Sequence, residues 1–296
     1  MKIWRVMNLI KWTTEYFQGY DIESARLDAE LLLGHLLNKS RLQLYLDFEQ
    51  VVDAEYLAQY RELIKKRVER IPVAYLINHK EFMSLNFYVD ENVLIPRPET
   101  EVLVEAVLIH QSDDCEFTTA SSTSLVVVEV GTGSGAIAVS LATKRPEWNI
   151  IATDISPPSL QIAQQNAQKH AVAERITFLH GDLFQPLQND YQGKCDWIVS
   201  NPPYIASEDI LTLAPEIKHE PRIALDGGAD GLAFICRLIA EAPDWLAPRG
   251  CLAFEFGYNQ RDSIVNLIES PKKYADYTII KDYADIDRVI IAQVGT

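Results

Sequence analysis

The segment Asn201-Pro202-Pro203-Tyr204 combines residue types that could hold a flat substrate carrying an amino group. It follows residues 195–200, an apolar-rich run that predicts a buried strand, so we expect it at that strand's carboxyl end. The two prolines lack backbone N–H donors but keep their carbonyl oxygens. Asn201 adds a side-chain carbonyl oxygen, and Tyr204 adds an aromatic face. These residues predict a rigid pocket of acceptors for an amide or an exocyclic amine, although a proline-stiffened turn is the alternative.

A glycine-rich loop lies upstream, between a predicted strand at residues 125–130 and a predicted helix at residues 136–142. Its residues are Gly131, Thr132, Gly133, Ser134 and Gly135. Strand, glycine loop and helix in this order are typical of the nucleotide-binding end of a Rossmann-type unit, because glycine lets a ligand approach the backbone. The G-x-G-x-G spacing is tighter than the dinucleotide motif, so a tight structural turn is the alternative here.

Asp154 follows a predicted strand at residues 149–153, about twenty residues beyond the glycines. At that position a carboxylate can accept hydrogen bonds from both hydroxyl groups of a ribose. The alternative is that Asp154 caps a helix predicted around residues 160–169. Because Pro157 and Pro158 separate Asp154 from that helix, the sequence leaves both roles open.

Asp182 and Leu183 follow a third predicted strand at residues 175–180, and Asp182 could accept a hydrogen bond from an adenine amino group. Glu129, near the end of the first strand, would be a further acid at the same edge of the sheet. Acids at the ends of three successive strands would surround an adenosine. The spacing therefore predicts a cofactor site that includes Glu129, Asp154 and Asp182.

Residues 129–135, Asp154 and residues 201–204 look like the motifs of class I S-adenosylmethionine-dependent methyltransferases that act on planar amino nitrogens. Further segments resemble the HemK/PrmC family of protein-(glutamine-N5) methyltransferases, namely residues 70–76, 81–82, 93–101, 219–228 and 230–232. The resemblance covers residues 20–295, nearly the whole chain. Two features depart from the family pattern. Asn78 stands where glycine is usual, which is a mild change because Asn tolerates a left-handed backbone, and a polar segment at residues 111–124 resembles an extended surface loop.

The resemblance implies an α/β fold, a class I methyltransferase Rossmann-like domain with a mostly parallel seven-stranded sheet. A small helical domain and a β-hairpin linker would precede it. The implied boundaries are residues 1–78 for helical substrate recognition, 79–97 for the linker and 98–296 for the methyltransferase domain. The cofactor would be S-adenosyl-L-methionine, and the product S-adenosyl-L-homocysteine.

The function that the resemblance implies is methylation of the glutamine side-chain nitrogen (N5) in the Gly-Gly-Gln motif of class I peptide chain release factors. This would support translation termination in the cytoplasm. The expected catalytic residues are Asn201, Pro202 and Tyr204, and Pro203 joins them in binding substrate. The expected cofactor-binding residues are Glu129, Gly131, Thr132, Gly133, Ser134, Gly135, Asp154, Asp182, Leu183 and Asn201. The sequence leaves open whether Arg97, Glu99 and Thr100 contact the cofactor or form caps and salt bridges.

The residue types favour a direct in-line transfer of the methyl group. An amide nitrogen is a poor nucleophile, and no Cys, His or Lys near residues 201–204 is placed as a strong base. The Asn201 side-chain oxygen and the Pro202 carbonyl could instead accept the two N–H protons of the substrate and aim its nitrogen at the methyl group. The Tyr204 ring would exclude water from the substrate plane.

Composition separates the function classes that the motifs leave open. The chain has 296 residues, of which 48% are hydrophobic and 23% charged, an ordinary balance for a globular protein of two domains. Its formal net charge of −15 opposes binding to phosphate backbones, which favours a protein substrate over DNA or ribosomal RNA. A basic patch, Lys65-Lys66-Arg67, is expected to be the solvated end of a helix. A cofactor-binding scaffold without catalysis is a third possibility, but it requires a damaged motif.

No segment of the sequence predicts a membrane span, a secretory signal or a metal site. Cys115, Cys195, Cys236 and Cys251 are scattered and form no paired motif, and the last three are expected to be buried thiols.

Periodicity predicts the remaining elements. A capped helix is expected from residues 21–24 onward, with a leucine stripe on one side, formed by Leu27, Leu31, Leu32, Leu36 and Leu37. A second helix is expected to end by Pro72. Residues 81–89 alternate loosely and lead to a turn signal at residues 90–92, which predicts a hairpin. Two final strands, residues 277–281 and 288–292, are expected to form an antiparallel pair.

Overall fold

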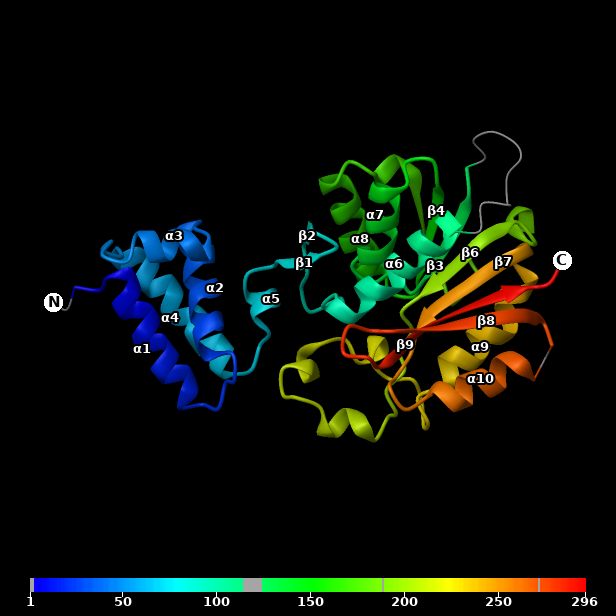
Figure 1. Ribbon diagram of the computed structural model, residues 1–296. Helices are drawn as coiled ribbons and strands as arrows, with labels where there is room; N and C mark the ends of the chain where they lie inside the picture. The colour runs from blue at the N-terminus through cyan, green and yellow to red at the C-terminus, as the bar shows by residue number, and fades with distance from the viewer. Residues whose placement is uncertain (1–2, 114–123, 188, 271) are drawn as a thin grey trace. The chain divides into compact units, whose positions relative to one another are not determined.

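The computed structural model describes most of the chain in two compact units (Figure 1). The described stretches are residues 3–113, 124–187, 189–270 and 272–296. Cys115 and most of the polar segment 111–124 lie outside them. No helix in the described stretches is long and apolar enough to cross a membrane.

The first unit comprises Met1–His79 together with Ala214–His219, and it is helical as predicted. Its helices are α1 (Val6–Gln18), α2 (Ala25–Leu37), α3 (Arg41–Leu46), α4 (Ala54–Val68) and α5 (Val73–Leu76). The solvated role expected for the basic patch is wrong for Arg67, which is buried. Its guanidinium donates to Asp28 at 2.7 Å and to Glu216 at 2.9 Å, so it ties segment Ala214–His219 to α2 and α4.

The buried face of α2 differs from the predicted leucine stripe. Leu27 is 41% exposed, and the buried positions include Ala25, Ala29 and Leu33 as well as the predicted Leu32. Small alanines on this face allow neighbouring helices to approach closely, which a pattern of large apolar residues does not reveal. The helix follows Ser24 without a side-chain capping bond, so the predicted cap is also wrong.

A short hairpin opens the second unit, which comprises Lys80–Leu213 and Glu220–Thr296. Strands β1 (Lys80–Phe82) and β2 (Leu85–Phe87) pair antiparallel. The hairpin was expected, but its turn lies at Met83 and Ser84, with φ of 52° and 61°, and not at residues 90–92. Such a turn normally carries Asn or Gly, so Met-Ser gives no sequence signal for it.

The central sheet has seven strands in the order β5-β4-β3-β6-β7-β9-β8, as the resemblance implied. The parallel strands are β3 (Val126–Val130), β4 (Asn149–Asp154), β5 (Ile176–His180), β6 (Cys195–Ser200) and β7 (Leu246–Glu255). The antiparallel pair β8 (Tyr274–Lys281) and β9 (Asp287–Val294) ends the chain at one edge, as predicted. The strand order reverses direction at β3, and such a point is where open α/β sheets bind ligands.

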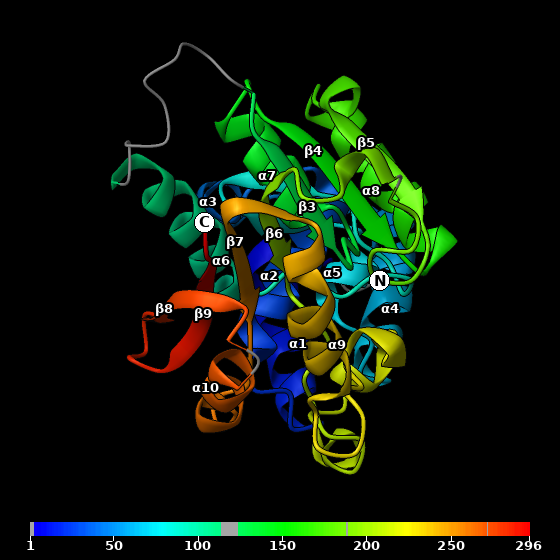
Figure 2. The same cartoon turned by 90° about the vertical axis from the view of Figure 1, so that its right-hand side faces the viewer.

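Helices cover both faces of this sheet (Figures 1 and 2). On one face lie α6 (Pro98–Asp113), α7 (Ala136–Lys144) and α8 (Pro157–Lys169), and on the other lie α9 (Ala233–Glu241) and α10 (Arg261–Glu269). Adjacent residues of β3 point to opposite faces of the sheet. Val127 packs with α6, α7 and α8, and Val128 packs with α9 and α10. Short 3-10 helices connect the elements at Ala173–Arg175, Asn189–Tyr191, Asp209–Thr212, Ile217–His219, Arg222–Ala224 and Ala242–Asp244.

Gly135 provides a test of how α7 and α8 pack. It has a φ of 79°, and an added Cβ would lie 3.0 Å from the Cβ of Ala163 in α8. Gly193 has a similar φ of 69°, but its added Cβ would meet nothing within 4 Å. We expect Gly135→Ala to lower the free energy of unfolding by about 2–3 kcal/mol and Gly193→Ala by about 1 kcal/mol in denaturant titrations. Equal losses would show that backbone strain alone matters.

Candidate active site

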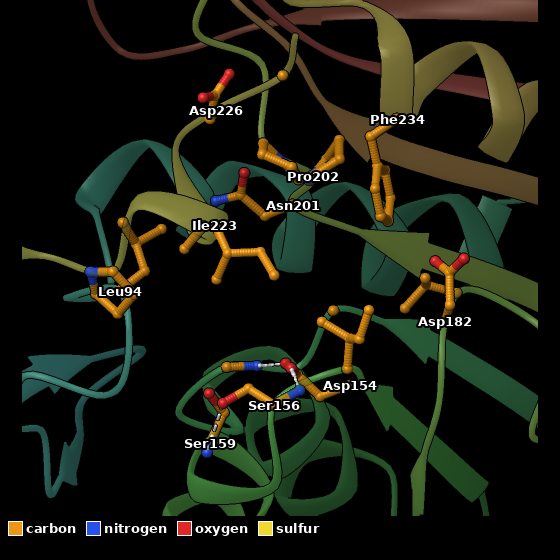
Figure 3. Close-up of a pocket in the computed structure, with 18 of the residues that line it drawn as sticks. Leu94, Asp154, Ser156, Ser159, Asp182, Asn201, Pro202, Ile223, Asp226 and Phe234 are labelled. Atoms are coloured by element: carbon orange, nitrogen blue, oxygen red, sulfur yellow. Dashed lines mark hydrogen bonds between the residues drawn. The ribbon is translucent and has the colours of Figure 1, made fainter. Parts of the chain in front are cut away.

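A cavity of about 560 Å³ opens at the carboxyl ends of the parallel strands in the second unit (Figure 3). Its volume lies within the range of small-molecule sites. Among the residues expected from the sequence, the lining includes Gly131, Gly133, Asp154, Asp182, Leu183, Asn201, Pro202 and Pro203. The remaining predicted residues, Glu129, Thr132, Ser134, Gly135 and Tyr204, are not part of the wall.

Two glycines of the loop open the backbone to this cavity. Gly131 and Gly133 have φ of 76° and 54°, and a Cβ added to either would meet no protein atom within 4 Å. Both line the cavity, so a ligand can lie directly against their backbone. Gly135 instead lies against Ala163 of α8, where a side chain would have no room.

Glu129 lies behind the loop, with its side chain within the protein. It is 1% exposed, and its Oε2 accepts hydrogen bonds from Thr132 Oγ1 at 2.6 Å and from the Ala138 backbone N–H at 3.0 Å. Burial raises the pKa of Glu129 to about 8. The carboxyl group thus joins the glycine loop to the start of α7, a contact that the predicted ring of three acids did not anticipate.

Asp154 lines the cavity and holds the glycine loop from the other side. Its Oδ2 accepts from the Gly133 N–H and its Oδ1 from the Ser156 N–H, both at 2.8 Å (Figure 3). Burial raises the pKa of Asp154, while these backbone bonds oppose the shift. The capping alternative for Asp154 is wrong, because the Ser156 side chain caps α8. The prolines at residues 157–158 begin the helix, where their missing N–H groups are not needed.

Asp182 is held by a partner that the sequence did not indicate. Both of its oxygens accept from Arg237 of α9, at 2.8 Å and 3.3 Å, and Arg237 also lines the cavity. Leu183 follows with a φ of 48° and is buried. Phe234, one turn before Arg237, lies on the same side of the cavity as Asp182 (Figure 3).

Apolar side chains supply a further part of the wall that sequence reasoning missed. Ile155 and Ile223 are 48% and 58% exposed, and both line the cavity with Leu94 and Phe234. Large exposed apolar side chains gathered at one cavity suit a flat ring. The resemblance had marked the segments of Leu94 and Ile223, but nothing in the sequence pointed to Phe234.

Asn201 and Pro202 lie across the cavity from Asp154 and Ser156 (Figure 3). The Asn201 Nδ2 donates a hydrogen bond to Thr100 Oγ1 at 2.9 Å. Thr100 stands in the first turn of α6 and is not part of the cavity wall. Thr100 supports the side chain of Asn201.

Tyr204 and Thr100 meet at a buried acid, Glu255, at the end of β7. The Tyr204 hydroxyl donates to Glu255 Oε1 at 2.9 Å, and Thr100 Oγ1 donates to Glu255 Oε2 at 2.6 Å. Burial raises the pKa of Glu255, against the effect of these two bonds and the nearby Arg288. The sequence showed Glu255 only as part of a strand, since no local pattern marks a residue that pairs across long separations.

Arg97 has a salt-bridge role. Its guanidinium pairs with Glu220, and Glu220 also accepts from the backbone N–H of Ile95 at 3.0 Å. These contacts fix the segment before α6 to the start of the segment that carries Ile223.

Comparisons with known proteins agree with this geometry. Two family models match, the PrmC N-terminal domain over residues 8–77 and the methyltransferase small domain over residues 116–229. The release factor glutamine methyltransferase of Geobacter sulfurreducens is 37% identical over 295 residues, which cover 99% of this chain and 98% of that protein. This chain belongs to the release factor glutamine methyltransferases. The Moorella thermoacetica protein of that name is 41% identical over 92% of both chains.

A solved methyltransferase structure has the same fold as this chain. A methyltransferase from Pyrococcus furiosus matches with a TM-score of 0.51 at 19% identity, over 78% of this chain and 100% of that chain. The methyl donor of the family is S-adenosyl-L-methionine. The cavity fits this molecule, because it combines two glycines with open backbone, an acid at the end of β4 and an apolar wall.

The buried acid behind the glycine loop predicts a specific pH dependence. The pKa of Glu129 rises from an ordinary 4.5 to about 8 on folding, so the folded chain keeps a proton that the unfolded chain loses. The stability due to neutral Glu129 is complete below the unfolded pKa and decreases as pH rises toward 8, by at most about 1.4 kcal/mol per pH unit.

Glu129→Gln removes this titration, and the amide oxygen can accept both existing bonds. We expect the free energy of unfolding of the variant, relative to the unchanged chain, to increase between about pH 5 and about pH 8. Denaturant titrations across this range measure the difference. Parallel stability curves for the two proteins would contradict the assignment of a neutral Glu129.

Proposed function

We propose that this chain transfers a methyl group from S-adenosyl-L-methionine to the glutamine side-chain nitrogen in the Gly-Gly-Gln motif of class I peptide chain release factors. S-adenosyl-L-homocysteine is the second product, and the reaction supports translation termination. The observation that carries the proposal is the position of Asn201 and Pro202 opposite Asp154 in one cavity. Asn201 and Pro202, which can accept hydrogen bonds from a substrate amide, thus face Asp154, which suits the ribose of an adenosine.

The orientation of the Asn201 amide supports the assignment of its oxygen as a hydrogen-bond acceptor for the substrate. Its Nδ2 is engaged by Thr100, so its Oδ1 is the end available to a substrate. Pro202 lines the same cavity, and we assign its carbonyl oxygen as the second acceptor. Together they match the two N–H bonds of a primary carboxamide.

Bound S-adenosyl-L-methionine supplies an electrophilic methyl group on a sulfonium. Among the described residues that line the cavity there is no Cys, His or Lys to act as a strong base. The protein therefore acts by orientation: the two acceptors hold the amide N–H bonds and favour pyramidalisation as positive charge develops on nitrogen. The surplus proton then leaves to solvent. Tyr204 anchors the segment through Glu255, and stacking of its ring on the substrate stays a prediction.

The assignment of residues to cofactor and substrate follows the cavity. Gly131, Gly133, Asp154, Asp182 and Leu183 bind the cofactor directly. Glu129, Thr132, Ser134 and Gly135 shape the loop that holds it, and Asn201 contacts both ligands.

The chain's regions also receive proposed roles. Residues 1–78 recognise the release factor, residues 79–97 link the domains and residues 98–296 carry out methyl transfer, in the cytoplasm. The helical unit has equal numbers of acidic and basic residues, so the net charge of −15 belongs to the second unit, which carries the cavity. This charge disfavours the alternative substrates, DNA and ribosomal RNA.

The direct test is transfer of label from S-adenosyl-L-methionine to a purified release factor. We expect label on the factor and none on a variant whose Gly-Gly-Gln glutamine is alanine. Label on RNA or DNA, falling steeply as salt increases, with none on the release factor, would overturn the proposed substrate while leaving the cofactor in place.

Removing the amide of Asn201 tests the role of the acceptor groups. We expect Asn201→Ala to lower turnover about a hundredfold or more, because the substrate nitrogen is no longer aimed. Calorimetry should show that the affinity for S-adenosyl-L-homocysteine stays largely intact and falls far less than turnover does. Asn266→Ala, at an exposed position in α10, is the matched control and should keep full activity. Near-normal turnover of Asn201→Ala would refute the orientation mechanism.

A further inference from the structure

Glu255 joins the two ends of the substrate-facing segment from behind. It is 1% exposed, and its two oxygens accept separate hydrogen bonds, one from Thr100 at 2.6 Å and one from Tyr204 at 2.9 Å. Thr100 in turn accepts from Asn201 at 2.9 Å. Glu255 is absent from the cavity wall, so it acts on a ligand only through these neighbours.

The hydrogen bonds that join Asn201, Thr100 and Glu255 fix which atom donates and which accepts at each step. The Thr100 hydroxyl donates its single hydrogen to Glu255 Oε2, and the other oxygen of Glu255 accepts from Tyr204. Only lone pairs of Thr100 then face Asn201, which must present its N–H2 group. Among the described residues, none donates a hydrogen bond to Asn201 Oδ1. The carbonyl end of the amide is thereby assigned to the substrate side.

We propose that Glu255 and Thr100 are positioning residues that lock the Asn201 amide with its oxygen toward the substrate, and so restrict the reaction to side chains that offer N–H donors. This inference rests on the proposed function and explains why the site would accept glutamine and reject glutamate. A glutamate side chain has nearly the shape of glutamine but carries only acceptor oxygens at neutral pH. Its lone pairs would meet those of Asn201 and Pro202, which is how a site built for N–H bonds rejects an isostere.

If Glu255 no longer accepts the hydrogen of Thr100, the preference for glutamine over glutamate is weaker. A threonine hydroxyl that lacks a fixed acceptor can donate to Asn201 as readily as it accepts, and the amide can then turn over. A turned amide presents N–H groups, which suit a carboxylate. Loss of these hydrogen bonds therefore lowers the rate of glutamine methylation. It also narrows the difference in methylation rate between glutamine and glutamate.

The test uses the pair Thr100→Val and Thr100→Ser in the full chain. Valine keeps the shape without the hydroxyl, and serine keeps the hydroxyl. The substrates are a release factor and its variant with glutamate in the Gly-Gly-Gln position, whose methylation would yield an ester. We expect Thr100→Val to lower kcat on glutamine by roughly tenfold to a hundredfold and to reduce the preference over glutamate about tenfold. Thr100→Ser should stay within about threefold on both measures.

Two further measurements separate positioning from folding. Affinity for S-adenosyl-L-homocysteine should be unchanged in Thr100→Val, and an equal loss of cofactor binding would overturn the proposal by showing general damage. Glu255→Gln, which preserves shape and can donate to Thr100, should reproduce the loss of preference. An unchanged preference in both variants would also overturn it.

A spectroscopic measurement distinguishes this proposal from the proposed function. The side-chain N–H signals of Asn201 in nitrogen-15 spectra, assigned with Asn201→Ala, should show slow exchange of one proton with solvent. That protection should vanish in Thr100→Val and persist in Thr100→Ser. If the unchanged chain fails to methylate any release factor, the function is wrong, yet this signal still decides the proton order.

Discussion

The parallel pairing of β3 with β4 and with β6 is the constraint on which the site depends. Val130 is in register with Thr153 on one side and with Ser200 on the other. The residues that come directly after these three are Gly131 of the glycine loop, Asp154 and Asn201, so the register alone brings them to one edge of the sheet. The backbone N–H of Gly131 bonds the Thr153 carbonyl at 2.9 Å, which continues the pairing into the loop itself.

Two buried acids stiffen the wall from behind, one on each side of the cavity. Glu129 accepts two hydrogen bonds that fix the glycine loop, and Glu255 accepts two that fix the segment from Asn201 to Tyr204. A buried acid that loses its hydrogen bonds lowers the stability of the fold. Each acid therefore keeps its two donors in place. The result is a cavity whose ligand-facing groups are oriented before any ligand arrives, which is what a reaction driven by orientation requires.

Sequence periodicity and short motifs predicted the elements that are locally encoded. The strands before Gly131, Asp154 and Asn201 could be read because apolar, β-branched runs end in glycine, acid or proline. The turn at Met83 and Ser84 could not, because its backbone is imposed by pairing and not by turn residues. Long-range partners were also invisible: Arg237 meets Asp182, and Glu255 meets Thr100, only once the sheet is folded. The site's motifs were therefore predictable, whereas its supporting contacts required the structure.

The most direct measurement is a crystal structure of the chain with S-adenosyl-L-homocysteine and a peptide containing Gly-Gly-Gln. We expect the cofactor product to lie against Gly131, Gly133 and Asp154, with the glutamine nitrogen within hydrogen-bond distance of both Asn201 Oδ1 and the Pro202 carbonyl. A glutamine bound with its carbonyl oxygen toward Asn201, or bound outside this cavity, would contradict it.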